Sequence, residues 1–243
     1  MNRVDAVWVV GRLTLVPLVR ALAPLRSYGT ERVPREGGVV LAFNHFSWLD
    51  PLAFGATSPR TVYYMAKAEA HRVPGLGQLI RSFGAFAVRR GQSDREAVRL
   101  MRDVVRSGHA LGLFVEGTRQ RSGMLGDVQP GAAMVAVQEG VPVVPAAIHG
   151  SHAWRLGNFA PVTVAWGTPM LLDGYPRNGK GYRAASGEIG RELRRLSEFC
   201  VAIHQLGRPA TAVPPVSGVP PSEVTSAAIG RAEPRVAAST EDR

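Results

Sequence analysis

Short apolar runs alternate with amphipathic stretches along the first 206 residues of the chain. Six of these runs are rich in β-branched or aromatic residues and have the length of strands. They cover residues 38–43, 61–65, 83–88, 110–115, 141–148 and 162–166. Because strands that alternate with helices are typical of α/β proteins, we expect a single α/β domain with a central mixed sheet flanked by helices.

Three segments show the apolar period of amphipathic helices. Residues 93–106 begin with Ser93 and Glu96, whose spacing is that of a capping box. Residues 130–139 are followed by Gly140, and residues 187–206 are followed by Gly207. Glycine often follows the last turn of a helix, so these two positions predict where the helices end.

The longest apolar stretch, residues 6–25, is interrupted by Arg12 and Arg20. Eight residues of helix place these arginines about 80° apart, on one side. This favours a helix in the plane of the membrane interface over a bilayer span or a signal peptide. A helix that packs on the domain, or one that does both, is the alternative. Residues 1–35 carry a net charge of +4, which favours an anionic leaflet. We assign residues 1–27 to an N-terminal amphipathic, membrane-associating helix.

Composition narrows the classes of protein. The 243 residues are 45% hydrophobic, enough to bury a core, and carry a net charge of +10. Such a charge favours nucleic acid, acidic lipid or phosphorylated small molecules as partners. Aromatic residues make up only 7% and the arginines are scattered, so we expect no nucleic-acid partner. Residues 208–243 are rich in Pro, Ala, Ser and Thr and predict a disordered tail, which leaves 28–207 as the main folded domain.

The cysteine and histidine residues indicate whether the chain could form disulfides or bind a metal ion. The single cysteine, Cys200, excludes an intramolecular disulfide framework and lies in a helical pattern that indicates a core thiol. His149 and His152 have the spacing of a ligand pair, but no acidic or thiol third ligand is near them in the sequence. We therefore expect no metal site.

His45 and Asp50 carry the first candidate chemistry. The histidine follows the predicted strand 38–43, and the carboxylate comes five residues later, directly before Pro51. An Asp-Pro pair is also typical of a helix N-terminus, and a loop histidine can simply be satisfied by backbone. In the chemical interpretation, the carboxylate orients an imidazole that removes a proton from a substrate hydroxyl. Because no G-x-S-x-G elbow occurs, that hydroxyl belongs to the substrate and no covalent enzyme intermediate is needed.

A second segment, residues 113–123, runs from a predicted strand into a turn rich in Gly, Thr and Arg. Such a turn offers backbone N–H groups, a hydroxyl and guanidinium groups to a phosphate. A basic hairpin loop without a ligand is the alternative.

Three ordered blocks resemble the glycerolipid acyltransferases, above all the 1-acylglycerol-3-phosphate acyltransferase type. They are Asn44-His45-x4-Asp50, the segment 114–119 (FVEGTR) and the segment 141–145 (VPVVP), and the resemblance covers roughly residues 28–170. A block at 84–90 also fits, although Arg89 stands where the family often has an aspartate.

The resemblance implies that residues 28–207 form an acyltransferase catalytic domain, and it implies a role for individual residues. His45 would be the general base and Asp50 its orienting partner. The glycerol-phosphate site would comprise Glu116, Gly117, Thr118 and Arg119, with Lys67 and Arg89 as further phosphate ligands. The acyl or acceptor pocket would be lined by Val141, Pro142, Val143, Val144 and Pro145.

The implied reaction moves a fatty acyl group from acyl-CoA or acyl-carrier protein to lysophosphatidate, which gives phosphatidate and requires no cofactor. The implied location is peripheral or monotopic on the cytoplasmic face of the cell membrane, and the oligomeric state is left open. Two alternatives stay open: an acyltransferase for another lysophospholipid or glycolipid acceptor, and a non-catalytic basic protein that binds membranes or nucleic acid.

Overall fold

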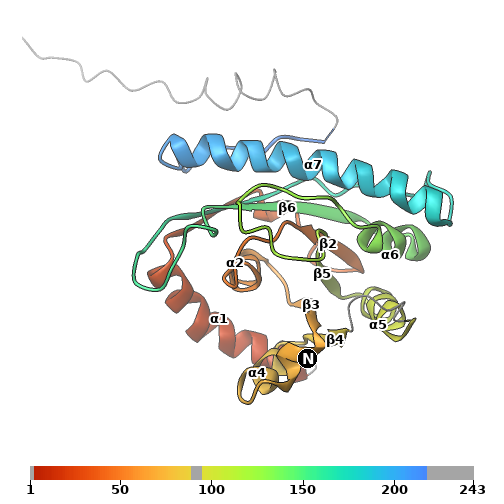
Figure 1. Cartoon of the computed structure of the whole chain (residues 1–243), viewed down its shortest axis with the longest axis horizontal. Coiled ribbons are helices and arrows are strands. Elements are labelled where there is room, and N and C mark those ends of the chain that lie inside the picture. The colour runs from red at the N-terminus through yellow and green to blue at the C-terminus, as the bar shows by residue number, and fades with distance from the viewer. Residues whose placement is uncertain (1–2, 89–94, 218–243) are drawn as a thin grey trace, which may run out of the picture.

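One seven-stranded sheet forms the centre of the protein (Figure 1). The computed structural model describes residues 3–88 and 95–217. The strand order is β1-β7-β6-β2-β5-β3-β4, and every neighbouring pair is parallel except β6 and β7. This confirms the mixed sheet. The strands are β1 (Leu25–Tyr28), β2 (Val39–Phe43), β3 (Val62–Lys67), β4 (Phe86–Val88), β5 (Ala110–Phe114), β6 (Val143–His149) and β7 (Val162–Trp166).

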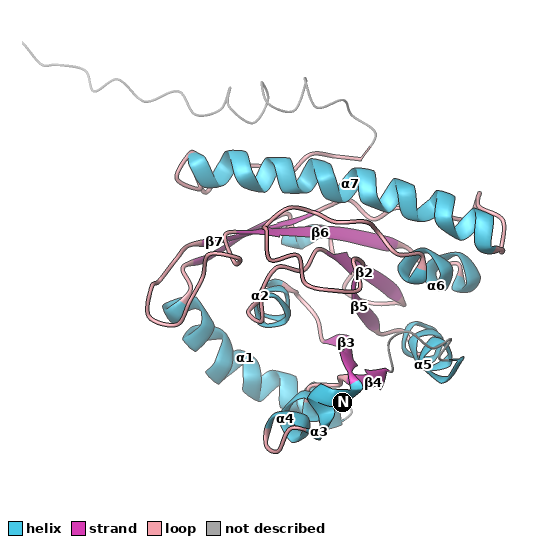
Figure 2. Cartoon of the chain, in the orientation of Figure 1, coloured by secondary structure: helices cyan, strands magenta, loops and turns pink. Residues whose placement is uncertain are grey.

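Helices cover both faces of the sheet, as expected (Figure 2). α1 and α2 lie on one face, and α5, α6 and α7 lie on the other. The short helices α3 and α4 adjoin α1 and the β3–β4 edge. The helices are α1 (Arg3–Leu22), α2 (Asp50–Thr57), α3 (Ala68–Arg72), α4 (Leu76–Ser82), α5 (Arg95–Arg106), α6 (Gly131–Glu139) and α7 (Gly179–Gln205), with a 3-10 turn, η1 (Thr30–Arg32).

The central strand β2 positions the candidate site. All five of its residues are buried because β5 and β6 flank it and helices cover both faces. Phe43, its last residue, stacks on Phe54 of α2 with ring centroids 4.0 Å apart and lies in register with Phe114 of β5. The chain therefore leaves β2 and β5 side by side at the carboxyl edge of the sheet, where α/β proteins usually bind ligands.

Several predicted boundaries need correction. Only Phe86–Val88 of the segment 83–88 form a strand, because Phe83 instead contacts Trp8 edge to face and accepts its indole N–H at the carbonyl. α7 begins at Gly179 rather than 187, because the side chain of Asn178 accepts the Gly181 N–H and caps the helix. Ser93, the predicted cap of α5, lies outside the described residues.

Helix α1 has apolar residues on two sides. Trp8 and Val19 are buried against the domain, and Arg12 donates to the carbonyls of Ser58 and Pro59. The outer side exposes Val9, Val10, Leu13 and Leu18, together with Thr14 and Arg20. The predicted helix is therefore present, but Arg12, one of the two arginines that interrupt the apolar stretch, faces the domain. Among the described residues, no helix is long and apolar enough to cross a membrane.

The start of the predicted disordered tail is ordered. Arg32 donates to the carbonyls of Pro214 and Pro215, and Ala212 is buried in a cluster with Tyr28. Residues 208–217 thus lie against the β1 side of the domain, which corrects the predicted start of disorder at residue 208. The rest of that prediction, residues 218–243, lies outside the described residues.

Candidate active site

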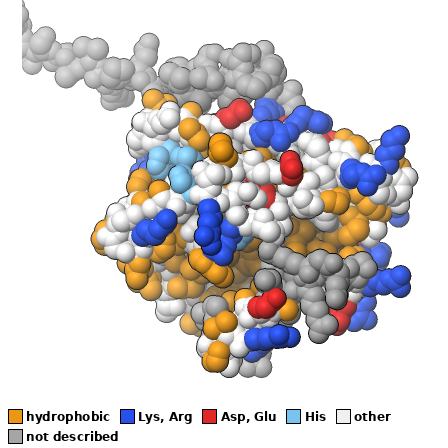
Figure 3. All heavy atoms as spheres, in the orientation of Figure 1, with side chains coloured by type: hydrophobic (Ala, Val, Ile, Leu, Met, Phe, Trp, Pro, Cys, Tyr) orange, Lys and Arg blue, Asp and Glu red, His pale blue; other side chains and the backbone are white. Residues whose placement is uncertain are grey.

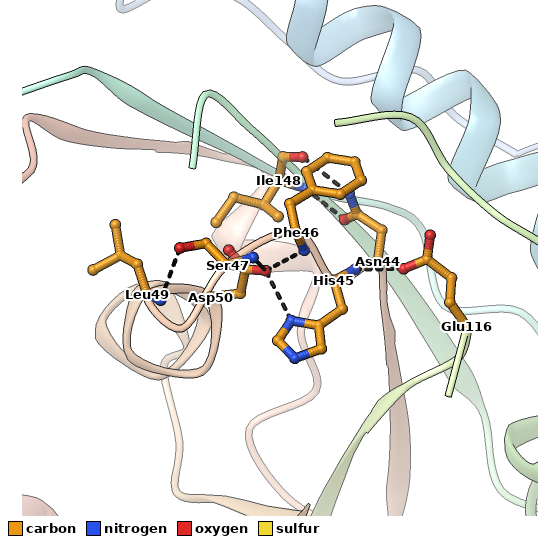
Figure 4. A network of polar contacts seen from close by, with 8 residues as sticks. All are labelled: Asn44, His45, Phe46, Ser47, Leu49, Asp50, Glu116 and Ile148. Carbon is orange, nitrogen blue, oxygen red and sulfur yellow. Dashed lines mark hydrogen bonds and ion pairs between the residues drawn. The ribbon is translucent and has the colours of Figure 1, made fainter. Parts of the chain in front are cut away.

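The loop after β2 is tied to β6 by Asn44. Its buried side-chain amide donates to the carbonyl of Ile148 at 3.0 Å, and its Oδ1 accepts the Ile148 N–H at 2.8 Å (Figure 4). One side chain thus continues the strand pairing beyond the end of β2, so the loop that follows starts from a fixed position.

His45 and Asp50 are hydrogen-bonded, with 2.9 Å between Nδ1 and Oδ2. This confirms the distance of about 3 Å expected for a hydrogen bond. The same Oδ2 accepts the backbone N–H groups of Phe46 at 2.5 Å and Ser47 at 2.7 Å. Asp50 is the first residue of α2, and Leu49 holds the N-cap position. The carboxylate therefore points back into the loop instead of capping the helix.

These contacts set the tautomer of His45. An oxygen that accepts two backbone N–H groups also serves as acceptor for the ring, so the neutral imidazole carries its proton on Nδ1. Nε2 is left with a lone pair and points away from the network (Figure 4). The side chain is 12% exposed, and its ring stacks on Phe114 with centroids 4.0 Å apart. The geometry suits a base that takes a proton at Nε2.

Glu116 braces the backbone of His45. The residue is 6% exposed, and its Oε2 accepts the His45 N–H at 2.5 Å while Oε1 accepts the Gly126 N–H at 2.8 Å. Burial raises its pKa to about 7, although the two backbone hydrogen bonds act in the opposite direction. The His45 carbonyl in turn accepts the Gln120 N–H.

The implied role of Glu116 in phosphate binding stays a prediction. Both of its oxygens accept backbone N–H groups of the protein, and a carboxyl group has no positive charge with which to attract a phosphate. The contacts that the structure describes are those of a residue that supports the loop. The next three residues, Gly117, Thr118 and Arg119, are more exposed than Glu116 and can meet a ligand at the surface.

Gly117 makes the turn that presents Arg119. Its φ of 71° lies in the left-handed region that glycine adopts at no steric cost, and its N–H donates to the Phe114 carbonyl. Thr118 is exposed. Arg119 lies with its Cζ 4.2 Å from the centroid of the Trp48 ring, and none of the ion pairs described within residues 3–88 and 95–217 includes it. Its charge is therefore free to meet a phosphate.

Two further phosphate ligands, Lys67 and Arg89, were implied by the resemblance. Lys67 is the last residue of β3, so its backbone lies at the carboxyl edge of the sheet where β2 and β5 also end. Arg89 lies outside the described residues.

An apolar cavity of about 290 Å³ lies beside the His45 ring. Phe114 links the two, because it lines the cavity and stacks on the imidazole. Figure 3 shows a hollow with hydrophobic walls near basic side chains on this face. The lining comes mainly from α1, α2, β3, α3 and α4: Trp8, Gly11, Leu15, Val16, Val19, Trp48, Pro51, Leu52, Gly55, Ala56, Tyr64, Met65, Ala66, Ala70, Ile80, Phe83, Ala85 and Phe114.

The five residues expected to line the apolar pocket do not line this cavity. Val143, Val144 and Pro145 are buried in β6, and Val141 and Pro142 lead into that strand. Their side chains are apolar because they pack in the core: β6 lies between β2 and β7 and has helices on either side.

The first amides of the loop cannot stabilise an oxyanion. The N–H of His45 donates to Glu116, and those of Phe46 and Ser47 donate to Asp50. An oxyanion donor has to come from elsewhere. In the part of the chain that the structure describes, no group of three or more His, Cys, Asp or Glu side chains could hold a metal ion.

Comparisons with known proteins show which family the chain is similar to. The model of the family described as "Acyltransferase" matches residues 24–149, just over half of the chain. The chain is similar to the 1-acyl-sn-glycerol-3-phosphate acyltransferases of Bacillus subtilis (28% identity; 54% of this chain, 65% of that protein) and Streptococcus pneumoniae (28%; 75% and 69%). The similarly named protein of Limnanthes douglasii is 32% identical over 62% of this chain and 56% of its own.

A solved structure shares the fold. The 1-acyl-sn-glycerophosphate acyltransferase of Thermotoga maritima superposes with a TM-score of 0.61 at 23% identity, over 79% of this chain and 82% of that one. The matched part of this chain spans between about half and about two thirds of the length of the three curated relatives.

Proposed function

Since the chain belongs to the acyltransferase family, we propose that it transfers a fatty acyl group from a thioester to the free hydroxyl of a 1-acylglycerol 3-phosphate. The product would be phosphatidate. The relatives' names supply the acceptor, and the residues of the candidate site supply the chemical reasons that follow.

One arrangement carries the proposal: a single apolar cavity has Phe114, which stacks on the oriented His45 ring, and Trp48, which holds the Arg119 guanidinium, in its lining. A lysophosphatidate has an acyl chain, a hydroxyl and a phosphate, and an acyl thioester adds a second chain. The cavity suits an acyl chain, and Arg119 suits the phosphate. The hydroxyl between them would lie near Nε2.

The proton moves twice in the proposed reaction. Nε2 of His45 takes the proton of the acceptor hydroxyl as its oxygen attacks the thioester carbonyl carbon, and a C–O bond forms. The imidazolium is stabilised by Asp50 at Nδ1. The tetrahedral intermediate then expels the thiolate as the C–S bond breaks, and the thiolate takes the proton back from Nε2. His45 ends in its starting state.

Glu116 and Asn44 act as positioning residues in this scheme. Each fixes backbone on one side of His45, through the His45 N–H and the Ile148 peptide group respectively. Neither touches the reacting atoms. Preorganised geometry of this kind is a large part of what an enzyme contributes to rate.

A membrane location follows from the proposed substrates, which are lipids. The outer side of α1 exposes Val9, Val10 and Leu13, and the chain carries a net charge of +10. We propose peripheral attachment to the cytoplasmic face, where acyl-CoA or acyl-carrier protein is present. Either thioester is compatible with the cavity.

The test is an assay of the purified chain with a panel of acceptors. Radiolabelled acyl-CoA and acyl-carrier protein are each offered lysophosphatidate, lysophosphatidylcholine, an acylated glycolipid, or no acceptor. We expect acyl transfer to be fastest to lysophosphatidate, because Arg119 meets its phosphomonoester. If transfer is fastest to an acceptor without a phosphomonoester, lysophosphatidate is not the substrate. If no acceptor is acylated, the protein is better explained as a non-catalytic lipid-binding protein.

A further inference from the structure

A second recess adjoins the apolar cavity at Trp8, which lines both, but lies away from His45. Its volume is about 340 Å³, and three arginines dominate its lining. The lining residues are Trp8, Val9, Arg12, Arg35, Arg60, Thr61 and His109.

The recess lies at the opposite edge of the sheet from His45. Arg35, Thr61 and His109 come shortly before β2, β3 and β5, which are parallel to one another. His45 follows the end of β2 at the carboxyl edge. A ligand in the recess would therefore be separated from the reacting atoms by the length of the strands.

Among the described residues, no carboxylate lines the recess, although Glu36 is near enough to act on Arg60. Arg60 donates to the backbone carbonyls of Pro34, Gly37 and Gly108, and Arg12 donates to two other carbonyls. These acceptors are neutral, and no Asp or Glu lines the recess. Burial lowers the pKa of Arg60, an effect that nearby Glu36 partly offsets. An anion entering the recess would remove this cost.

Apolar surface adjoins the charged recess. Val9 lines the recess and is 49% exposed, and the same side of α1 exposes Val10 (60%) and Leu13 (76%). A small inorganic anion would gain no binding energy from this apolar surface. A phospholipid has an anionic headgroup directly above its acyl chains, so both parts of the surface would be occupied at once.

We propose that this recess binds the phosphate of an anionic phospholipid headgroup while the outer side of α1 lies in the same leaflet. Arg35 is the principal contact, because Arg12 and Arg60 are already engaged with backbone and Arg35 is exposed at the recess. The proposal rests on the proposed membrane attachment and not on acyl transfer.

The test is flotation of the full chain with vesicles of phosphatidylcholine alone or mixed with phosphatidylglycerol. Arg35→Ala should weaken binding to the mixed vesicles by roughly fivefold, and Arg35→Glu by roughly 25-fold, since each basic residue near an anionic surface contributes about that factor. Arg183→Ala is the matched control. It removes an exposed arginine from α7 on the other face of the sheet and should change binding less than twofold.

A second variant separates the two parts of the surface. Leu13→Ser should weaken binding to both kinds of vesicle, whereas Arg35→Ala should weaken only the part that depends on phosphatidylglycerol. If Arg35→Ala and Arg183→Ala weaken binding equally, the recess has no special role and the proposal fails. If wild-type protein does not float with either vesicle, membrane attachment fails as well, while the acyl-transfer assay in detergent still stands as a separate result.

The source of the phosphate is decided by competition. Soluble short-chain phosphatidylglycerol, inorganic phosphate and an RNA oligonucleotide are each added at matched ionic strength. We expect only the short-chain lipid to displace the protein from mixed vesicles, and this displacement should be lost in Arg35→Glu. Equal displacement by inorganic phosphate, or stronger displacement by RNA, would overturn the assignment to a lipid.

Discussion

The guanidinium of Arg119 lies over the indole ring of Trp48, with 4.2 Å between Cζ and the ring centroid. Trp48 also lines the apolar cavity and is 68% exposed. One aromatic side chain therefore contacts both the proposed acyl-chain cavity and the proposed phosphate ligand. Cation–π contact of this kind holds a guanidinium in place without neutralising its charge.

Replacing Trp48 should loosen Arg119. In Trp48→Ala we expect the KM for lysophosphatidate to rise about two- to fivefold, in line with the strength of an exposed cation–π contact. Trp48→Phe keeps an aromatic face and should restore most of the affinity. Steady-state kinetics with the acceptor varied measures both. A fall in kcat alone, with KM unchanged and no rescue by phenylalanine, would remove Trp48 from this role.

Removing Arg119 should mainly weaken acceptor binding. Loss of a charge-assisted hydrogen bond typically costs about 1.5–3 kcal/mol, so Arg119→Ala should raise the KM for lysophosphatidate by roughly 10- to 100-fold. Arg121→Ala removes an exposed arginine two residues away and serves as the control. An effect of Arg119→Ala confined to kcat would contradict the assignment of this residue to the phosphate.

Glu116 predicts a pH dependence of stability. Its pKa is raised to about 7 in the folded protein from an ordinary value of 4.5, so between these pH values the folded state holds a proton that the unfolded state has lost. The contribution of this group to the free energy of unfolding therefore falls as pH rises through that window. The difference in Tm between wild type and Glu116→Gln should be more favourable to wild type at pH 5 than at pH 8. Thermal melts of the two proteins measure it, and a constant difference would show that the buried carboxyl does not titrate in this range.

Reducing the volume of the cavity should shorten the acyl chain that the protein prefers. Ala70 of α3 lines the cavity and is only partly buried, so Ala70→Leu takes up space with little cost to the fold. We expect the preferred thioester to shift to a shorter acyl chain, while Ala70→Ser keeps the wild-type preference. Competition between thioesters of graded length measures the shift. Unchanged preference in the leucine variant would place the acyl chain elsewhere.

Features that depend on residues close together in the sequence could be predicted from it. His45 and Asp50 are five residues apart in one loop, so their hydrogen bond follows from local geometry once the preceding strand is recognised. The strand at 162–166 was likewise predictable, because four of its five residues are β-branched or aromatic.

Contacts set by the register of the sheet could not be predicted in this way. Glu116 meets the His45 N–H 71 residues away because β2 and β5 are neighbours in parallel register. The cavity draws on α2, α3 and α4, which have five to eight residues each and are too short to show a clear apolar period. The pocket was therefore predicted at the more conspicuous apolar segment 141–145, which the sheet buries.

The central claim is that His45 removes the proton from the acceptor hydroxyl. It is tested most directly by the kcat of purified His45→Ala with lysophosphatidate and acyl thioester, with circular dichroism and thermal melting to show that the fold persists. We predict a fall of about 10²- to 10⁴-fold, the usual contribution of a positioned general base. Turnover close to that of wild type by a folded variant would contradict the account.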